Sequence, residues 1–316
     1  MSENSAVTKL LITGASGLLG ANLVLESATN YSVIAVYHSH PIQMKDVASK
    51  CVDLTDERAV EQLISSAAPD WVVHCAAETN VDRCEQDHAH ALLMNRDMAG
   101  WVARAAMRSN ARFVHISTDA VFDGRRAGLT EQDASAPPNV YGSSKLEGEK
   151  AVLRENPRAL VVRTNFFGWN AHNKQSLAEW FLDNLQRNKQ CNGFSNIKVK
   201  MLLVNDLVAI LMQMIELKLS GIYHVLARDC ISKYEFGVRL AAEFEMDKEL
   251  ITPVAVEEAG LGAVRALNLC LSTEKIEHAL GRKLPSVTEG LRKFHQLHLA
   301  GFPERLKAIA GGPQND

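Results

Sequence analysis

Short apolar runs alternate along the chain with segments whose apolar residues recur at helical spacing. Each apolar run predicts a strand, and the runs lie at residues 9–13, 32–37, 48–52, 71–77, 112–117 and 159–164. Helical spacing follows at 18–28, 56–67, 89–109 and 141–155. Strands that alternate with helices pair in parallel through right-handed crossovers, and strands that are apolar throughout are covered on both faces. The first half therefore predicts an α/β fold built on a doubly wound parallel sheet.

The second half of the chain is less regular. We expect helices at 176–187, 205–217 and 233–245, with a short strand at 222–226. No internal repeat or low-complexity linker separates the halves, so a smaller α/β lobe should pack against the main domain. We assign residues 1–170 and about 197–230 to the main domain, about 171–196 and 231–310 to the lobe, and 311–316 to a frayed tail.

Composition and charge exclude several classes of protein. The 316 residues are 47% hydrophobic, which is enough for a sizeable core. The 34 basic and 37 acidic residues nearly balance, which argues against a broad basic face for nucleic acid. No apolar run approaches the about 18 residues that span a bilayer, and the opening residues, MSENSAVTK, lack a secretory signal. We therefore expect a cytoplasmic protein with no membrane or nucleic-acid partner.

The cysteines and histidines show no metal-binding pattern. None of the six cysteines forms a C-x-x-C pair, and without an export signal we expect all six to be reduced thiols. Three close histidine pairs, at 38 and 40, 88 and 90, and 295 and 298, lack neighbouring ligands at usual spacing. We interpret these histidines as surface or packing residues and predict no metal site.

A glycine-rich turn, TGASGLLG from Thr13, connects the first strand to the first helix with spacing G-x-x-G-x-x-G. Glycine permits the tight turn and lets a pyrophosphate approach the backbone. The helix that follows presents free N–H groups and a positive dipole end to the phosphates. In this βαβ context the turn predicts a Rossmann fold that binds a dinucleotide. The predicted contacts are Gly14, Ser16, Gly17, Leu18 and Leu19.

The residues after the second strand favour NADP over NAD. An acidic residue at this position binds the ribose hydroxyls and repels a 2′-phosphate, but the segment after Tyr37 reads His38-Ser39-His40 and has no carboxylate before Asp46. We predict that His38 and Ser39 bind NADP, with NAD possible. In the alternative interpretation these histidines are simply exposed loop residues.

Two further strand ends could contact the cofactor. Asp53 and Leu54 follow the third strand and could bracket the adenine, although Asp53 could equally cap the next helix. Cys75, Ala76 and Ala77 end the fourth strand with small side chains. These residues would let the cofactor approach the sheet edge, or they could serve close helix–sheet packing.

Three polar residues form a candidate catalytic group. Tyr141 and Lys145 lie four residues apart at the start of a helix and share one face. A lysine ammonium beside a phenol favours the phenolate and lowers its pKa toward useful acid–base strength. The fifth strand ends in Ser117-Thr118, where a hydroxyl can hydrogen-bond a carbonyl that becomes an alkoxide. We predict that Thr118, Tyr141 and Lys145 are catalytic and that Ser117, Tyr141 and Lys145 also contact the cofactor.

Six stretches carry a family resemblance: TGASGLLG, DLTD at Asp53, VVHCAAETNVDRCE at Val72, ISTDAVFDG at Ile116, NVYGSSKLEGE at Asn139 and VRTNFFG at Val162. A weaker match, GIYHVLA, begins at 221. In combination they resemble the extended short-chain dehydrogenases/reductases, and within them the dTDP-4-dehydrorhamnose reductase group.

The resemblance implies roles for particular residues. Tyr141 would donate the proton, Lys145 would hold the nicotinamide ribose, and Thr118 would polarise the keto oxygen. Asp119 would lie near the sugar, and Asn165 could reach the substrate diphosphate or else cap the sixth strand as a buried amide. The remaining implied contacts are Gly17, Leu18 and Leu19 with the pyrophosphate, Asp53 and Leu54 with the adenine, and Ala76, Ala77 and Glu78 with the cofactor.

The substrate half departs from the family pattern. Phe166 stands where the group usually has tryptophan, and residues 195–201 do not match the family segment D-Q-x-G-x-P-T. Residues 265–272 lack the usual proline and aspartate. The sequence therefore leaves the sugar open, although Phe166 remains a predicted substrate contact.

The leading hypothesis is an NAD(P)-dependent reductase that acts on a keto group of a nucleotide-activated sugar. A homodimer is compatible with this hypothesis. A sugar-nucleotide epimerase would use the same tyrosine and lysine, whereas Ala120 in place of glutamate disfavours a dehydratase. In the third hypothesis, an NADP-binding regulatory subunit without turnover docks on a metabolic enzyme.

Overall fold

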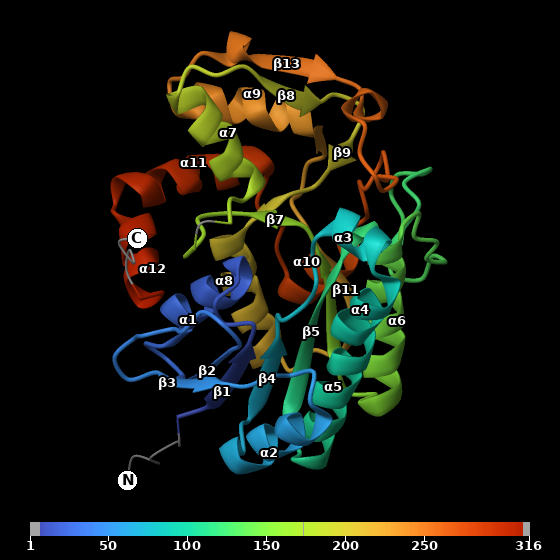
Figure 1. The fold of residues 1–316 in the computed structure, drawn as a ribbon, viewed down its shortest axis with the longest axis vertical. Coiled ribbons are helices and arrows are strands. Elements are labelled where there is room, and N and C mark those ends of the chain that lie inside the picture. The colour runs from blue at the N-terminus through green and yellow to red at the C-terminus, as the bar shows by residue number, and fades with distance from the viewer. Residues whose placement is uncertain (1–6, 173, 312–316) are drawn as a thin grey trace.

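A seven-stranded parallel sheet forms the centre of the protein (Figure 1). The computed structural model describes residues 7–172 and 174–311, so residues 312–316 of the predicted tail lie outside the described residues. The strands lie in the order β11-β6-β5-β4-β1-β2-β3, and every neighbouring pair is parallel. Their bounds are β1 Lys9–Thr13, β2 Ser32–Tyr37, β3 Ala48–Cys51, β4 Trp71–His74, β5 Arg112–Thr118, β6 Leu160–Thr164 and β11 Gly221–Val225. The predicted doubly wound α/β fold is confirmed.

Apolar side chains cover both faces of this sheet. Along β1, Leu10 and Ile12 pack into one core layer and Leu11 into the other, since successive side chains of a strand point to opposite faces. Helices α1 (Leu18–Ser27) and α8 (Val204–Glu216) pack together on the first face. Helices α2 (Glu57–Ala67), α5 (Met98–Arg108) and α6 (Val140–Glu155) pack on the second.

The strand order reverses between β1 and β4. In open α/β sheets, ligands bind outside the carboxyl ends of the strands at such a switch point. The glycine-rich turn after β1 and the small residues after β4 therefore meet at one place, as Cys75 N donating to Thr13 O at 3.3 Å shows.

The single helix expected at 89–109 is interrupted. It is divided into α4 (His88–Leu92), a π-helical turn (Leu93–Asp97) and α5. Asn95 in the π turn exchanges hydrogen bonds of 2.9 and 3.0 Å with the backbone of Glu78 and donates to Ser144 Oγ at 2.9 Å. The irregular turn thus ties the segment after β4 to α6, beside the candidate site.

The remaining elements gather beyond the carboxyl ends of the sheet and along one side of it. Helices α7 and α9 with strands β8 and β13 lie together at the top of Figure 1. Three two-stranded sheets pair β7 with β10, β9 with β12 and β8 with β13. The bounds are α3 Val81–Gln86, η2 Asp119–Val121, β7 Phe166–Phe167, α7 Leu177–Gln186, β8 Cys191–Phe194, β9 Lys198–Val199, β10 Leu202–Leu203, β12 Ile231–Ser232, α9 Lys233–Glu243, η3 Lys248–Leu250, β13 Ile251–Val254, η4 Val256–Ala259, α10 Glu274–Leu280, α11 Val287–Leu299 and α12 Phe302–Ile309. Within the described residues, no helix combines the length and apolarity needed to cross a membrane.

Candidate active site

A cleft of about 810 Å³ opens at the carboxyl ends of the central strands. The glycine-rich turn forms one wall, and the ends of β5 and β6 and the start of α6 form the other. Fourteen of the predicted site residues line it. They are Gly14, Ser16, Gly17, Leu18, Leu19, Cys75, Ala77, Ser117, Thr118, Asp119, Tyr141, Lys145, Asn165 and Phe166.

The glycine-rich turn has the shape of a phosphate cradle. Gly14 has φ +61°, and a Cβ atom there would lie 2.6 Å from Ala76 N. A Cβ at Gly20 would overlap the carbonyl oxygen of Gly14. Helix α1 begins after Gly17, which offers no side-chain cap, so the first N–H groups of the helix remain free for an anion. This backbone fits a dinucleotide pyrophosphate.

The candidate catalytic residues lie on the opposite wall. Thr118 ends β5, and Tyr141 and Lys145 lie in the first turns of α6. That helix begins where Asn139 Oδ1 accepts from Gly142 N at 2.8 Å. The Lys145 ammonium donates to the carbonyl oxygen of Ile116 at 2.7 Å, which fixes it beneath the end of β5.

Burial sets the protonation of these groups. Loss of solvent around its hydroxyl raises the pKa of Tyr141 to about 12, against the opposing effect of a hydrogen bond with Thr118. The expected lowering by Lys145 is therefore wrong for this structure, because desolvation dominates and the ammonium is directed to Ile116. Burial also lowers the pKa of Lys145 to about 8, although the charge of Glu149 opposes this. Tyr141 is thus protonated at neutral pH.

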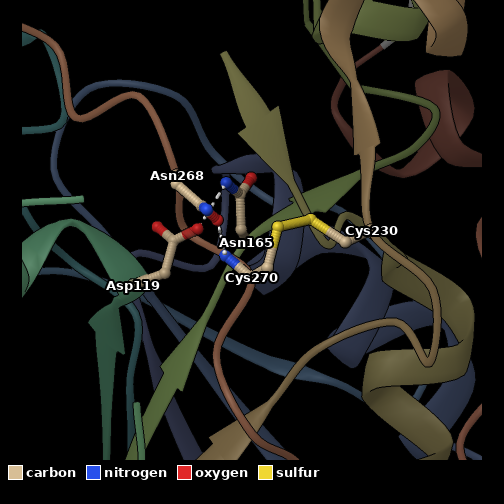
Figure 2. Close-up of a disulfide and its surroundings, with 5 residues drawn as sticks. All are labelled: Asp119, Asn165, Cys230, Asn268 and Cys270. Carbon is tan, nitrogen blue, oxygen red and sulfur yellow. Dashed lines mark hydrogen bonds between the residues drawn. A yellow bond between two sulfur atoms is a disulfide. The ribbon is translucent and has the colours of Figure 1, made fainter. Parts of the chain in front are cut away.

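Asp119 and Asn165 form a polar pair deeper in the cleft. Asn165 Nδ2 donates to Asp119 Oδ2 at 2.8 Å, and Thr118 Oγ1 donates to Asp119 Oδ1 at 3.2 Å. Burial raises the pKa of Asp119 to about 6 despite these bonds and the charge of Lys233. Figure 2 shows the side chain of Asn268 pointing toward this pair from the other side. The amide of Asn165 therefore faces the cleft and its neighbours rather than the strand end.

Six predicted cofactor contacts lie outside the lining of the cleft: His38, Ser39, Asp53, Leu54, Ala76 and Glu78. Asp53 accepts from Thr55 N and Thr55 Oγ1 at 2.9 and 2.7 Å. The alternative of Asp53 as a helix cap is wrong, because Asp56 caps α2. The Glu78 carboxylate forms an ion pair with Arg83 at 3.3 Å. The backbone of Ala76 packs closely against Gly14.

Several lining residues escaped prediction because distant segments bring them together. His40 and His172 face each other with ring centroids 4.8 Å apart, and both line the cleft near the glycine-rich turn. Lys233 begins α9, and Arg265 forms an ion pair of 2.9 Å with Asp82. His40 belongs to the segment after β2 that was linked to the cofactor phosphate, although only His38 and Ser39 were predicted as contacts. No local motif distinguishes the other three, and two of them follow β11, where the expected pattern is weakest.

A disulfide links Cys230 to Cys270 beside the polar pair (Figure 2). The expectation of six reduced thiols is therefore wrong. The two cysteines are 40 positions apart in sequence, but the fold brings their Cα atoms to 5.6 Å, within the range that a disulfide needs. Cys270 follows Leu269, which lines the cleft. The backbone N–H of Cys270 donates to Asn268 Oδ1 at 3.2 Å. The disulfide thus anchors the segment that forms one side of the site.

The switch-point cleft, the glycine-rich turn and the group of Thr118, Tyr141 and Lys145 define the class of the protein, an extended short-chain dehydrogenase/reductase. The RmlD substrate binding domain matches residues 8–299, and the chain belongs to that family.

Relatives and solved structures agree with this placement. The probable low-salt glycan biosynthesis reductase Agl14 of Haloferax volcanii is 30% identical over 89% of this chain and 95% of its own. The methionine adenosyltransferase 2 subunit beta of Danio rerio is 31% identical over 85% of this chain and 84% of its own. A crystal structure of dTDP-4-dehydrorhamnose reductase from Bacillus anthracis in complex with NADP superposes with a TM-score of 0.83 at 28% identity, covering 92% of this chain and 99% of that one.

Proposed function

We propose that the protein reduces a keto group on a nucleotide-activated sugar with NADPH. One observation carries this proposal: Thr118, Tyr141 and Lys145 line the same cleft as the glycine-rich turn, whose backbone fits a pyrophosphate. A hydride acceptor bound between the two walls would meet a protonated phenol and a strand-end hydroxyl together.

The reaction needs a hydride and a proton, and they come from different sources. When bound, the dihydronicotinamide supplies the hydride to the carbonyl carbon. Tyr141 gives its phenolic proton to the carbonyl oxygen, which becomes the alcohol. Thr118 hydrogen-bonds that oxygen as negative charge develops on it. Lys145 would hold the nicotinamide ribose, and its positive charge, one helical turn away, would favour the phenolate that Tyr141 then carries.

The adenosine end of the cleft favours a phosphorylated cofactor. β2 ends without a carboxylate, and His40, three residues after β2, lines the cleft with its ring against that of His172. Imidazole groups can hydrogen-bond a 2′-phosphate, whereas an acidic residue would repel it. The NADP complex of the Bacillus anthracis relative supports the same choice.

The opposite end of the cleft suits the anionic part of a nucleotide sugar. Lys233 and Arg265 line it, and a guanidinium matches the geometry of phosphate oxygens. Phe166 and the Asp119–Asn165 pair line the same cleft as these cations and Tyr141, and the sugar ring would bind beside them.

Deuteride transfer tests the proposal. The protein is incubated with NADPH carrying deuterium at C4 and with a panel of nucleotide-linked 4-keto sugars, and the products are weighed by mass spectrometry. We expect one substrate to gain deuterium with one NADP⁺ formed per product. Absence of transfer to every member of the panel, with NADPH bound, would contradict the reductase assignment.

A second candidate has specific support. The relative from Danio rerio is a subunit of methionine adenosyltransferase 2, and residues 195–201 and 265–272 of this chain depart from the reductase pattern. In this alternative the chain binds NADP and docks on a metabolic enzyme without turnover. Stoichiometric recovery of such an enzyme with the tagged chain, together with no deuterium transfer, would favour it.

A further inference from the structure

A buried ion pair lies behind the catalytic wall. Glu149 on α6 and Arg163 on β6 have side chains only 2% and 4% exposed. Arg163 Nη2 donates to Glu149 Oε2 at 2.7 Å and Arg163 Nε to Oε1 at 2.9 Å. The hydroxyl of Ser117 on β5 donates to the same carboxylate. One carboxylate therefore joins α6 to the two strands whose ends form the site.

Among the groups that contact the Arg163 guanidinium, Glu149 is the one that carries a negative charge. Arg163 also donates to Ser135 Oγ at 3.2 Å and lies 3.4 Å from Nε2 of His224. His224 Nδ1 donates to the carbonyl of Ser272 at 3.1 Å, so Nε2 is the unprotonated nitrogen. Burial lowers the pKa of His224 to about 3, which leaves that imidazole neutral.

Lys145 lies one helical turn before the same carboxylate on α6. The negative charge of Glu149 raises the pKa of the ammonium against the effect of burial. The other titratable groups that face Lys145 are uncharged: burial lowers the pKa of His74 to about 3, lowers that of His115 well below its usual range and raises that of Cys75 to about 12.

We propose that Glu149 is a positioning residue for the reaction, because its carboxylate, bound to Arg163 of β6 and Ser117 of β5, lies one helical turn from Lys145 and keeps Lys145 as an ammonium directed to the end of β5. The inference rests on the proposed function for its catalytic meaning. Its physical basis is independent of turnover, since an arginine in a protein does not give up its proton. Removal of the carboxylate would leave two buried cations, and Lys145 is the one that can become neutral.

Two variants should shift Lys145 in opposite directions. Glu149→Gln keeps the shape and removes the charge, so the pKa of Lys145 should fall by at least about one unit. Arg163→Met removes the competing cation and keeps an aliphatic side chain over Phe122, so the same pKa should rise. Glu147→Gln is the matched control, because Glu147 lies on the same helix and pairs with Lys150 at the surface.

The measurement is an NMR titration of protein labelled with ¹³C at lysine Cε, in which the Lys145 resonance is identified by its loss in Lys145→Met. The titration needs no substrate, so its result stays valid even if the reductase assignment fails. Where turnover is found, the alkaline limb of kcat/KM should move to a pH lower by about one unit or more for Glu149→Gln, while the KM for NADPH stays within about threefold. A Lys145 pKa that is unchanged in both variants, or that shifts in the same direction in both, would overturn the proposal. Should Glu149→Gln fail to fold, the upward shift in Arg163→Met decides alone.

Discussion

Reduction of the Cys230–Cys270 disulfide should destabilise the protein and loosen the substrate side of the cleft. The bond closes a loop of 40 positions, and the chain-entropy relation gives about 4 kcal/mol for a loop of that length. Arg265, Ala266 and Leu269 of the anchored segment line the cleft. The KM for the nucleotide sugar should therefore rise on reduction, whereas the affinity for NADPH, which depends on the distant glycine-rich turn, should not change.

The assay compares protein purified without reductant with the same protein after treatment with dithiothreitol. Thiol titration in urea should find four reactive cysteines in the first sample, since Cys51, Cys75, Cys84 and Cys191 are free, and six in the second. Urea unfolding should then show the loss of about 4 kcal/mol. The variant Cys230→Ser should behave like the reduced protein, and Cys51→Ser should not. Six reactive thiols before reduction, or equal unfolding free energies, would refute the reasoning.

Three further predictions concern the cleft. Gly20→Ala should abolish dinucleotide binding, because its Cβ would overlap the Gly14 carbonyl; calorimetric titration with NADP⁺ checks this, and retained affinity would contradict the cradle. Asp119→Asn should change the pH dependence of stability: its pKa is raised from 3.8 to about 6, so the folded protein binds the extra proton between those values. The contribution of Asp119 to stability is therefore present below about pH 4 and is lost as pH rises through 6, by up to about 3 kcal/mol, and unfolding curves of the variant should lack this loss. His40→Gln should weaken NADP⁺ about tenfold and NAD⁺ little by loss of a 2′-phosphate contact, with His278→Gln on α10, outside the lining of the cleft, as control; equal losses for both cofactors would place His40 elsewhere.

Local sequence patterns were sufficient to predict the central sheet, the glycine-rich turn and the Tyr141–Lys145 pair. The strands at 9–13 and 32–37 were predicted to the residue, because a buried parallel strand is an uninterrupted apolar run bounded by turns. The glycine-rich turn and the Tyr141–Lys145 spacing were equally visible, since each lies within a few consecutive residues. Their convergence on one cleft followed from the rule that parallel strands end at one edge.

The rest of the site depends on tertiary structure that no local pattern carries. Lys233 and Arg265 reach the cleft only because the segments after β11 fold back over it. Cys230 and Cys270 meet for the same reason. The pKa of Tyr141 was predicted in the wrong direction because spacing shows a nearby lysine but not the loss of solvent, which is the larger effect here.

The most direct test of the reductase assignment is the turnover of Tyr141→Phe. This change removes the proton donor and leaves the glycine-rich turn intact, so NADPH affinity should stay within about twofold while kcat falls by about 10² or more. The control variant Tyr31→Phe should retain full activity, because the hydroxyl that it removes lies beside Glu216, outside the lining of the cleft. Stopped-flow oxidation of NADPH with the substrate found by deuteride transfer measures both quantities. Undiminished turnover in Tyr141→Phe would contradict the account.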